Sequence, residues 1–320
     1  MKQKPKNKPI IFVADGGIGK CIVATVPIRN LKKKYPERNI IVVTGHPEVF
    51  ISNPNVHRIY RFGNSPYFFE DYIQGKKATL LKSEPYQHED YIYGKRHIAD
   101  VWCEGIGVRF DNPKPELYVS EAEKEKARRF LNLPDTDKNC KEGCEKPAQV
   151  GSPRIPLILQ SSGGGIPQPN QPPPRMYIRD ISPKLGKALT YKLKENHKIY
   201  HIRTQAQTSL PFADILNFPL RDIFAIIAVV DKFVLIDSFV QHACAAFGKK
   251  AVVLWGGTAP KVLGYDTAVN LTRSVCPTPF CHRPNSYFFD MSPTGAWECP
   301  HGEKCMGFEA GEIIKALGKK

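Results

Sequence analysis

The fold of this chain is decided by the stretch Val234-Leu-Ile-Asp-Ser-Phe-Val-Gln-His-Ala-Cys-Ala-Ala-Phe-Gly248. Its apolar start, residues 233–236, predicts a buried strand. Asp237 and Ser238 are residue types that cap helix N-termini, and the Ala-rich segment 240–247, closed by glycine, predicts a helix. A second apolar strand is expected at 251–254, ending in the turn Gly256-Gly257-Thr258. The stretch therefore predicts a strand–helix–strand unit.

Polar side chains gather where these strands end. In open α/β sheets, ligands bind outside the carboxyl ends of the strands. A helix N-terminus there offers backbone N–H groups and a positive dipole end to an anion. An ordinary βαβ unit with capped ends accounts for the apolar residues, but less well for the cluster of Asp237, Ser238, Gln241 and His242 at one helix start. We therefore predict an anion-binding site at this position.

The pattern Asp-Ser-x3-His-x2-Ala-Ala, followed by a strand and Trp-Gly-x-Thr-x-Pro, covers residues 237–260. It resembles the donor-site signature of glycosyltransferase family 9, the ADP-heptose:lipopolysaccharide heptosyltransferase family. The resemblance implies an α/β fold of GT-B architecture, with two Rossmann-like domains facing a cleft. It also implies inverting, metal-independent transfer of a sugar, such as a heptose, from a nucleotide-sugar donor to a glycan or lipopolysaccharide-like acceptor, with no cofactor for catalysis.

The same resemblance implies how the donor is held. The donor phosphates would lie on three backbone N–H groups at the helix start, those of Ser238, Phe239 and Val240. Asp237 would bind sugar hydroxyls, and His242 would support the pyrophosphate or the helix start.

A second polar loop follows the apolar strand predicted at 155–160. Its sequence, Ser161-Ser-Gly-Gly-Gly165, supplies hydroxyls and flexible backbone suited to phosphate oxygens. A flexible loop is the alternative. The resemblance implies that Ser161 and Ser162 contact the donor pyrophosphate, and that Gly257 and Thr258 line the base or sugar side.

The N-terminal segment predicts another βαβ unit, with strands at 9–14 and 39–44 and a helix at 21–35. Its turn Asp15-Gly-Gly-Ile-Gly-Lys20 and the helical Thr25-Val-Pro27 resemble the N-terminal motif of the same family. The aspartate that serves as catalytic base in that family falls on Lys20.

Lysine acts as a base only when burial depresses its pKa strongly. Asp15, or another carboxylate from the acceptor side, is the candidate to replace it. Asp15 and Lys20 are therefore the candidate catalytic residues. A non-catalytic protein that binds nucleotide-sugars or glycans is the alternative function. A degenerate P-loop is a further alternative, but Ala14 and Cys21 stand where that motif needs glycine and Ser or Thr.

The length of 320 residues suits two domains. We expect an N-terminal Rossmann-like acceptor domain at 1–150 and a C-terminal donor domain at 151–320. A C-terminal helix at about 308–317 is implied to pack back toward the first domain. A helix is expected at 91–102, and Ser120-Glu-Ala-Glu123 predicts a capping box. The acceptor candidates, by position alone, are His46, Glu84, Tyr86 and His88, and for each of them an ordinary surface-loop residue is the alternative.

Four cysteines lie within the Cys-rich segment 276–305: Cys276, Cys281, Cys299 and Cys305. Thiolates give Zn²⁺ a closed tetrahedral shell, so this segment predicts a structural zinc site, with free thiols as the alternative. Three other cysteines lie in helical patterns and are expected to be buried as small apolar residues. They are Cys21, Cys103 and Cys244.

A formal net charge of +15 suits an anionic partner. A nucleotide-sugar fits this balance, as does peripheral contact with an anionic membrane. We see no zinc-finger, helix-turn-helix or RNA-recognition pattern, so specific binding to nucleic acid is not expected. No apolar run reaches the length needed to span a bilayer. The basic start lacks an adequate signal-peptide core, and a cytoplasmic protein is expected.

Overall fold

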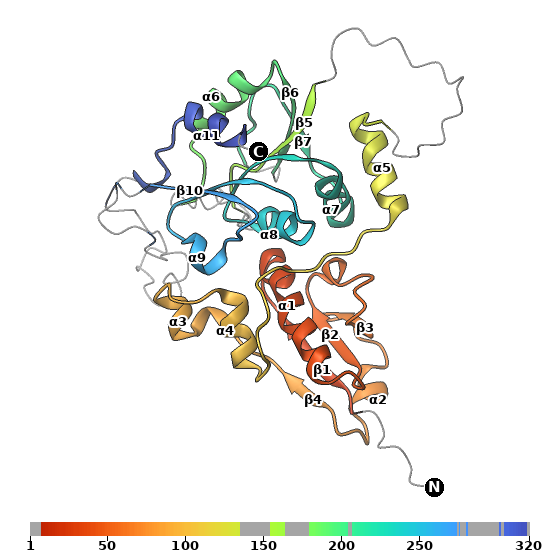
Figure 1. Cartoon of the computed structure of the whole chain (residues 1–320). Helices are drawn as coiled ribbons and strands as arrows, with labels where there is room; N and C mark the ends of the chain where they lie inside the picture. Colours follow the sequence, from red (N-terminus) through yellow and green to blue (C-terminus); the bar gives the residue numbers. More distant parts are fainter. Residues whose placement is uncertain are drawn as a thin grey trace, which may run out of the picture.

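The computed structural model describes residues 8–134, 154–163, 179–203, 207–273, 275, 280, 301 and 304–318. Within these residues the chain forms two parallel β-sheets flanked by helices, one sheet in each half of the molecule (Figure 1). The strand order is β3-β2-β1-β4 in the first sheet and β10-β9-β8-β5-β6-β7 in the second. The α/β prediction with two Rossmann-like units is confirmed.

The first sheet consists of β1 (Ile10–Ala14), β2 (Ile40–Thr44), β3 (Arg58–Arg61) and β4 (Thr79–Leu81). Its central strands are almost entirely apolar because helices cover both faces of the sheet. On one face Phe12 packs with Ile22 and Trp102, which belong to α1 (Ile18–Lys34) and α4 (Ile98–Gly105). On the other face Ile11 and Ile41 pack with Tyr72 of α2 (Phe68–Tyr72).

The helix expected at 91–102 is two helices, α3 (Glu89–Ile92) and α4. The chain turns between them at Gly94, whose φ of 67° suits a residue without a Cβ. The new helix then begins at His97, whose side chain accepts the N–H of Ala99. Short 3₁₀ turns complete this half at η1 (Pro47–Val49) and η2 (Pro85–Gln87).

The second sheet has six strands in the described part of the chain: β5 (Ile155–Leu159), β6 (His197–Ile202), β7 (Ala213–Leu216), β8 (Lys232–Ile236), β9 (Val252–Trp255) and β10 (Val269–Thr272). Its helices are α6 (Pro183–Leu193), α7 (Leu220–Val229), α8 (Phe239–Ala246), α9 (Pro260–Leu263) and α11 (Ala310–Leu317), with a 3₁₀ turn η3 (Lys304–Met306). Strand β7 is absent from the sequence prediction because it is a half-exposed edge strand without an apolar run.

Helix α11 packs against α6, β8 and β9 of the second sheet. Its buried residues Ile313 and Leu317 belong to the same apolar cluster as Val234 and Leu254. Figure 1 shows it beside α6, away from the first sheet. The implied packing of the C-terminal helix toward the first domain is therefore wrong, because the apolar face of α11 is buried against the second sheet and α6.

The two halves meet where α1 packs against α8. One continuous apolar cluster includes Ile22 and Val26 of α1 together with Val240 and Ala243 of α8. Helix α5 (Glu121–Leu131) packs against α7 of the second sheet. The expected boundary at residue 150 lies outside the described residues, and we retain the division into an acceptor and a donor domain as a proposal.

The three cysteines of α1, α4 and α8 are buried in the fold. Cys21, Cys103 and Cys244 are buried thiols, as predicted. None of the helices in the described ranges combines the length and apolar character needed to cross a bilayer.

Arg221 of α7 forms hydrogen bonds and an ion pair with Glu123 of α5. Ser120 and Glu123 form the predicted capping box at the start of α5. The Arg221 guanidinium donates to both carboxylate oxygens of Glu123, at 2.8 and 2.7 Å, and to the carbonyl of Tyr118 at 2.8 Å. The bonds from Arg221 lower the pKa of Glu123 from 4.5 to about 2. This pair therefore stabilises the folded chain above pH 4.5, and its contribution is lost as the pH falls toward 2.

We expect Arg221→Ala to lower the free energy of unfolding by about 2 kcal/mol at pH 7, because a bidentate charged contact is lost. The difference from wild type should shrink as the pH falls from 4.5 toward 2, because Glu123 is then protonated in the folded chain as well. Urea unfolding at several pH values measures both effects. Arg129→Ala is the control, because Arg129 is exposed and its Nε lies 4.0 Å from Glu125. An equal loss in the two variants would contradict the role given to Arg221.

Candidate functional site

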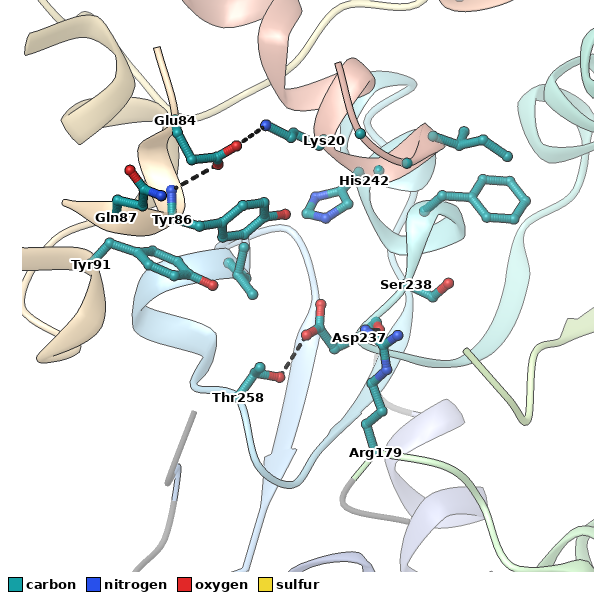
Figure 2. A pocket seen from close by; sticks show the side chains of 16 residues that line it. Lys20, Glu84, Tyr86, Gln87, Tyr91, Arg179, Asp237, Ser238, His242 and Thr258 are labelled. Carbon is teal, nitrogen blue, oxygen red and sulfur yellow. Dashed lines mark hydrogen bonds and ion pairs between the residues drawn. The ribbon is translucent and has the colours of Figure 1, made fainter. Parts of the chain in front are cut away.

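A cavity of about 480 Å³ lies between the two halves, at the carboxyl ends of the strands (Figure 2). Residues of the first half form one wall: Gly16, Gly17, Ile18, Gly19, Lys20, Glu84, Tyr86, Gln87 and Tyr91. The opposite wall is formed by Arg179, Asp237, Ser238, Phe239, His242, Thr258 and Leu263. We call this space the interdomain cavity. Its position agrees with the rule that ligands of parallel sheets bind outside the strand carboxyl ends.

Asp237 and Thr258 meet in the wall of the interdomain cavity that the second half forms. Asp237 follows β8 and Thr258 follows the neighbouring β9, so the parallel pairing of these strands brings the two residues together. The Thr258 hydroxyl donates to Asp237 Oδ2 at 2.6 Å, and Asp237 is 4% exposed. In Figure 2 the carboxylate points toward the cavity. A buried carboxylate with one oxygen fixed in this way is positioned to accept hydrogen bonds from ligand hydroxyls.

Helix α8 begins at the cavity wall. Ser238 is its N-cap residue, but the Ser238 side chain makes no capping hydrogen bond. Its Oγ instead accepts a hydrogen bond from Gln160 Nε2 at 3.0 Å, from the end of β5. The first N–H groups of a helix have no partner within the helix. Because Ser238 does not cap them, the start of α8 can receive an anion.

His242 stands one turn into α8. Its Nδ1 lies 2.7 Å from the Tyr265 hydroxyl. Burial lowers the pKa of His242 to about 3, so the imidazole is neutral at physiological pH and acts by hydrogen bonding. A Cβ on Gly19 would lie 3.1 Å from His242 Cδ2. The glycine at position 19 thus lets α1 approach α8 closely at the cavity.

Lys20 forms the centre of an ion-pair cluster at the opposite wall. Its Nζ donates to Asp15 Oδ1 at 2.7 Å and to Glu84 Oε2 at 2.6 Å. The Lys20 side chain is 5% exposed. Gly16 has a φ of +87°, and a Cβ there would lie 2.8 Å from Lys20 Cδ. Glycine at position 16 therefore suits both this backbone conformation and the Lys20 side chain that lies against it.

Asp15 contacts two lysines, Lys20 and Lys82. Its Oδ2 is 3.4 Å from Lys82 Nζ, so each carboxylate oxygen has its own cation. Burial raises the pKa of Asp15, but the hydrogen bonds and charges of Lys20 and Lys82 outweigh burial, and the pKa falls below its ordinary value.

The structure brings together about half of the predicted catalytic and donor-binding residues. Six of them line the interdomain cavity: Lys20, Asp237, Ser238, Phe239, His242 and Thr258. The others are not among the described residues that line it: Asp15, Ser161, Ser162, Val240 and Gly257. The Ser161 Oγ lies 2.8 Å from His201 Nε2.

Of the four acceptor candidates, Glu84 and Tyr86 line the cavity. His88 accepts the Asp90 N–H and caps α3, while His46 precedes η1. Lys20 Nζ lies over the Tyr86 ring, 5.6 Å from the ring centroid. Burial raises the pKa of Tyr86, with smaller contributions from Asp237 and Glu84, so its phenol is neutral.

Arg179 is a cavity residue that the sequence does not indicate. Its Nη1 donates to the Asp237 carbonyl at 3.3 Å. A Cβ on Gly163 would lie 2.7 Å from Arg179 Nε, so the glycine after β5 makes room for the guanidinium. The residue stands outside any periodic segment, so no sequence pattern points to it.

The predicted zinc site stays a prediction. Cys276, Cys281 and Cys299 lie outside the described residues, and Cys305 is buried. Within the described part of the chain, no group of three or more His, Cys, Asp or Glu side chains could hold a metal ion.

No family model and no curated protein matches the chain. Its structure is similar to that of a family 9 glycosyl transferase from Veillonella parvula DSM 2008, with 15% identity and a TM-score of 0.60 over 98% of this chain and 97% of that chain. It is also similar to ADP-heptose LPS heptosyltransferase II from E. coli, with 14% identity and a TM-score of 0.57 over 84% of this chain and 91% of that chain.

A third similar structure is the dodecameric iron-containing heptosyltransferase TibC from enterotoxigenic E. coli, in complex with ADP-D-β-D-heptose. Its identity is 11% and its TM-score 0.63, over 98% of this chain and 78% of that chain. These likenesses confirm the predicted fold and the resemblance to family 9 at the level of structure.

We expect Thr258→Val to lower the free energy of unfolding by about 2 kcal/mol, because the buried Asp237 carboxylate loses a hydrogen-bond donor. Chemical denaturation measures the change. Thr272→Val, at an exposed threonine of β10, is the matched control and should change stability by less than about 0.5 kcal/mol. Similar stabilities for both variants would show that the Thr258–Asp237 contact does not hold the carboxylate.

Proposed function

We propose that the chain is a glycosyltransferase that moves a sugar of the heptose type from a nucleotide-sugar donor to a glycan or lipopolysaccharide-like acceptor. The observation that carries the proposal is the interdomain cavity. It places a buried carboxylate, Asp237, and the uncapped start of α8 at the carboxyl ends of β8 and β9. The fold is shared with TibC, a heptosyltransferase whose solved complex contains ADP-D-β-D-heptose.

The donor would lie along the second wall of the cavity. Its diphosphate would bind the first N–H groups of α8, at Ser238, Phe239 and Val240, where the helix dipole favours negative charge. Asp237 would accept hydrogen bonds from sugar hydroxyls, and His242 would act as a neutral hydrogen-bonding group. The donor pyrophosphate would also contact Ser161 and Ser162. The base or sugar of the donor would lie beside Gly257 and Thr258.

The reaction needs two further contributions. The diphosphate gains negative charge as it leaves, and preorganised N–H groups stabilise such charge without reorganisation. Arg179 adds a cation on the same wall, beside the Asp237 carbonyl. On the acceptor side a base must take the proton of the attacking hydroxyl. The Lys20 cluster, with Asp15, supplies the catalytic candidates, and the mechanism uses no metal.

We expect Asp237→Asn to weaken binding of ADP-heptose about 10- to 100-fold, because charged hydrogen bonds to the sugar contribute about 1.5–3 kcal/mol. Isothermal titration calorimetry and mass spectrometry of a glycan acceptor pool measure binding and transfer. Asp231→Asn is the matched control: this exposed aspartate precedes β8 at the opposite end of the strand and pairs with Lys249.

The two measurements separate the candidate functions. Donor binding with transfer in the wild type supports the transferase. Binding without transfer or donor hydrolysis would favour a non-catalytic binding protein. Absence of binding to ADP-heptose and to other nucleotide-sugars would contradict the donor site itself.

We also propose that the first half contacts an anionic membrane, where a lipopolysaccharide-like acceptor would be presented. Support comes from three large apolar side chains, each more than half exposed: Tyr67, Phe69 and Leu80. We call them the α2 patch. Leu80 pairs in register with Ile11, which belongs to the cluster under α2, so Leu80 points to the face that α2 covers. Lys76 and Lys77 are exposed between α2 and β4 and match an anionic surface.

We expect the chain to sediment with vesicles of phosphatidylglycerol and phosphatidylcholine, but weakly with phosphatidylcholine alone. The double variant Phe69→Ser with Leu80→Ser should bind at least 10-fold more weakly, because each side chain loses roughly 1.5–3 kcal/mol of apolar burial. Phe212→Ser with Ile215→Ser, at exposed positions of the second half, is the control. Equal vesicle binding by the two double variants would exclude the α2 patch as the contact.

A further inference from the structure

We propose that Glu84 is the catalytic base of the sugar transfer, and that Lys20 is a positioning residue that holds Glu84 at the reaction centre. This inference rests on the proposed function, because a base is needed only if an acceptor hydroxyl is deprotonated. The chain offers two carboxylates to the Lys20 ammonium, Asp15 and Glu84. The surroundings of the two carboxylates differ, and this difference favours Glu84 over Asp15 as the base.

The first difference is location. Glu84 lines the interdomain cavity, whereas Asp15 is not among the described residues of its lining. Figure 2 shows Glu84 on the wall of the first half, with Tyr86 between it and the Asp237 side. A base must come within hydrogen-bond reach of the proton that it removes. Glu84 meets this requirement for an acceptor that enters the cavity.

The second difference is how the oxygens are occupied. Both oxygens of Asp15 face a cation, Lys20 at 2.7 Å and Lys82 at 3.4 Å. Glu84 gives Oε2 to Lys20, while its Oε1 accepts the backbone N–H of Tyr86 at 3.3 Å. A carboxylate oxygen has two lone pairs. Oε1 can therefore also accept a hydrogen bond from an acceptor hydroxyl.

The third difference concerns the direction of the reaction. Inverting transfer needs attack on the side of the sugar opposite the leaving diphosphate. The start of α8, which would hold the diphosphate, belongs to the second wall, and Glu84 belongs to the first. A sugar held between these walls by Asp237 would present its anomeric carbon to an acceptor that approaches from Glu84.

Glu84 Oε1 takes the proton of the acceptor hydroxyl, and the hydroxyl oxygen forms a bond to the anomeric carbon. The bond between that carbon and the diphosphate oxygen breaks, and its electron pair leaves with the nucleoside diphosphate. Lys20 takes no part in the proton transfer, and its Nζ holds the two carboxylates in place.

The test compares Glu84→Gln with Asp15→Asn in the full chain, using ADP-heptose as donor and lipopolysaccharide-type glycans or water as acceptor. ADP release gives kcat and KM, and calorimetry with ADP gives the affinity of the donor site. We expect Glu84→Gln to lower kcat about 100- to 10,000-fold. Its affinity for ADP should stay within about twofold of wild type, because the donor phosphates bind the other wall. Asp15→Asn should lower kcat less than about 10-fold.

Chemical rescue separates a base from a structural role. Sodium formate should restore part of the activity of Glu84→Ala, with sodium chloride at equal ionic strength as control, because a small carboxylate can replace the missing base. Absence of rescue, an active Glu84→Gln, or a loss in Asp15→Asn that equals or exceeds that in Glu84→Gln would overturn this inference alone. A wild type that releases no ADP would overturn the proposed transferase, and the inference with it.

Discussion

The site depends on the contact between α1 and α8. Each helix begins next to the carboxyl end of a central strand, β1 in the first sheet and β8 in the second. Packing them together places the two sets of strand ends on opposite sides of one cavity. The close approach is possible because Gly19 has no side chain: a Cβ there would lie 3.1 Å from His242 Cδ2 and 3.5 Å from Phe239 Cα. The apolar cluster that continues through Ile22 and Ala243 then fixes the arrangement.

Much of the donor side could be predicted from the sequence. The apolar runs and the glycines at 234–258 determine β8, α8 and β9, and the rule for strand carboxyl ends places Asp237 near Thr258. These features are local, so residues close in sequence carry them. The capping box at Ser120 was predictable for the same reason, because its two side chains are three residues apart.

The rest depends on contacts between distant parts of the chain. Lys20 and Glu84 are separated by 64 positions, and neither belongs to a periodic pattern that could reveal the pair. Arg179 reaches Asp237 from 58 positions away. The packing of α11 was misjudged because an amphipathic helix shows that it buries one face but not against which sheet. Strand β7 was not predicted because an exposed edge strand has no run of apolar residues.

The Lys20 cluster shows why burial of charge bears on function. A buried ion pair is rarely the most stable way to fill space, since desolvation of the charges opposes their attraction. An apolar side chain of similar volume at position 20 would pack against Trp102 and Tyr86, whose rings already lie 5.7 and 5.6 Å from Lys20 Nζ. The chain instead keeps a cation 5% exposed, with a carboxylate on either side, and a single glycine at position 16 makes room for it. One carboxylate of this cluster, Glu84, opens onto the interdomain cavity. Stability alone does not require such an arrangement, whereas positioning a charged group for a ligand in the cavity does.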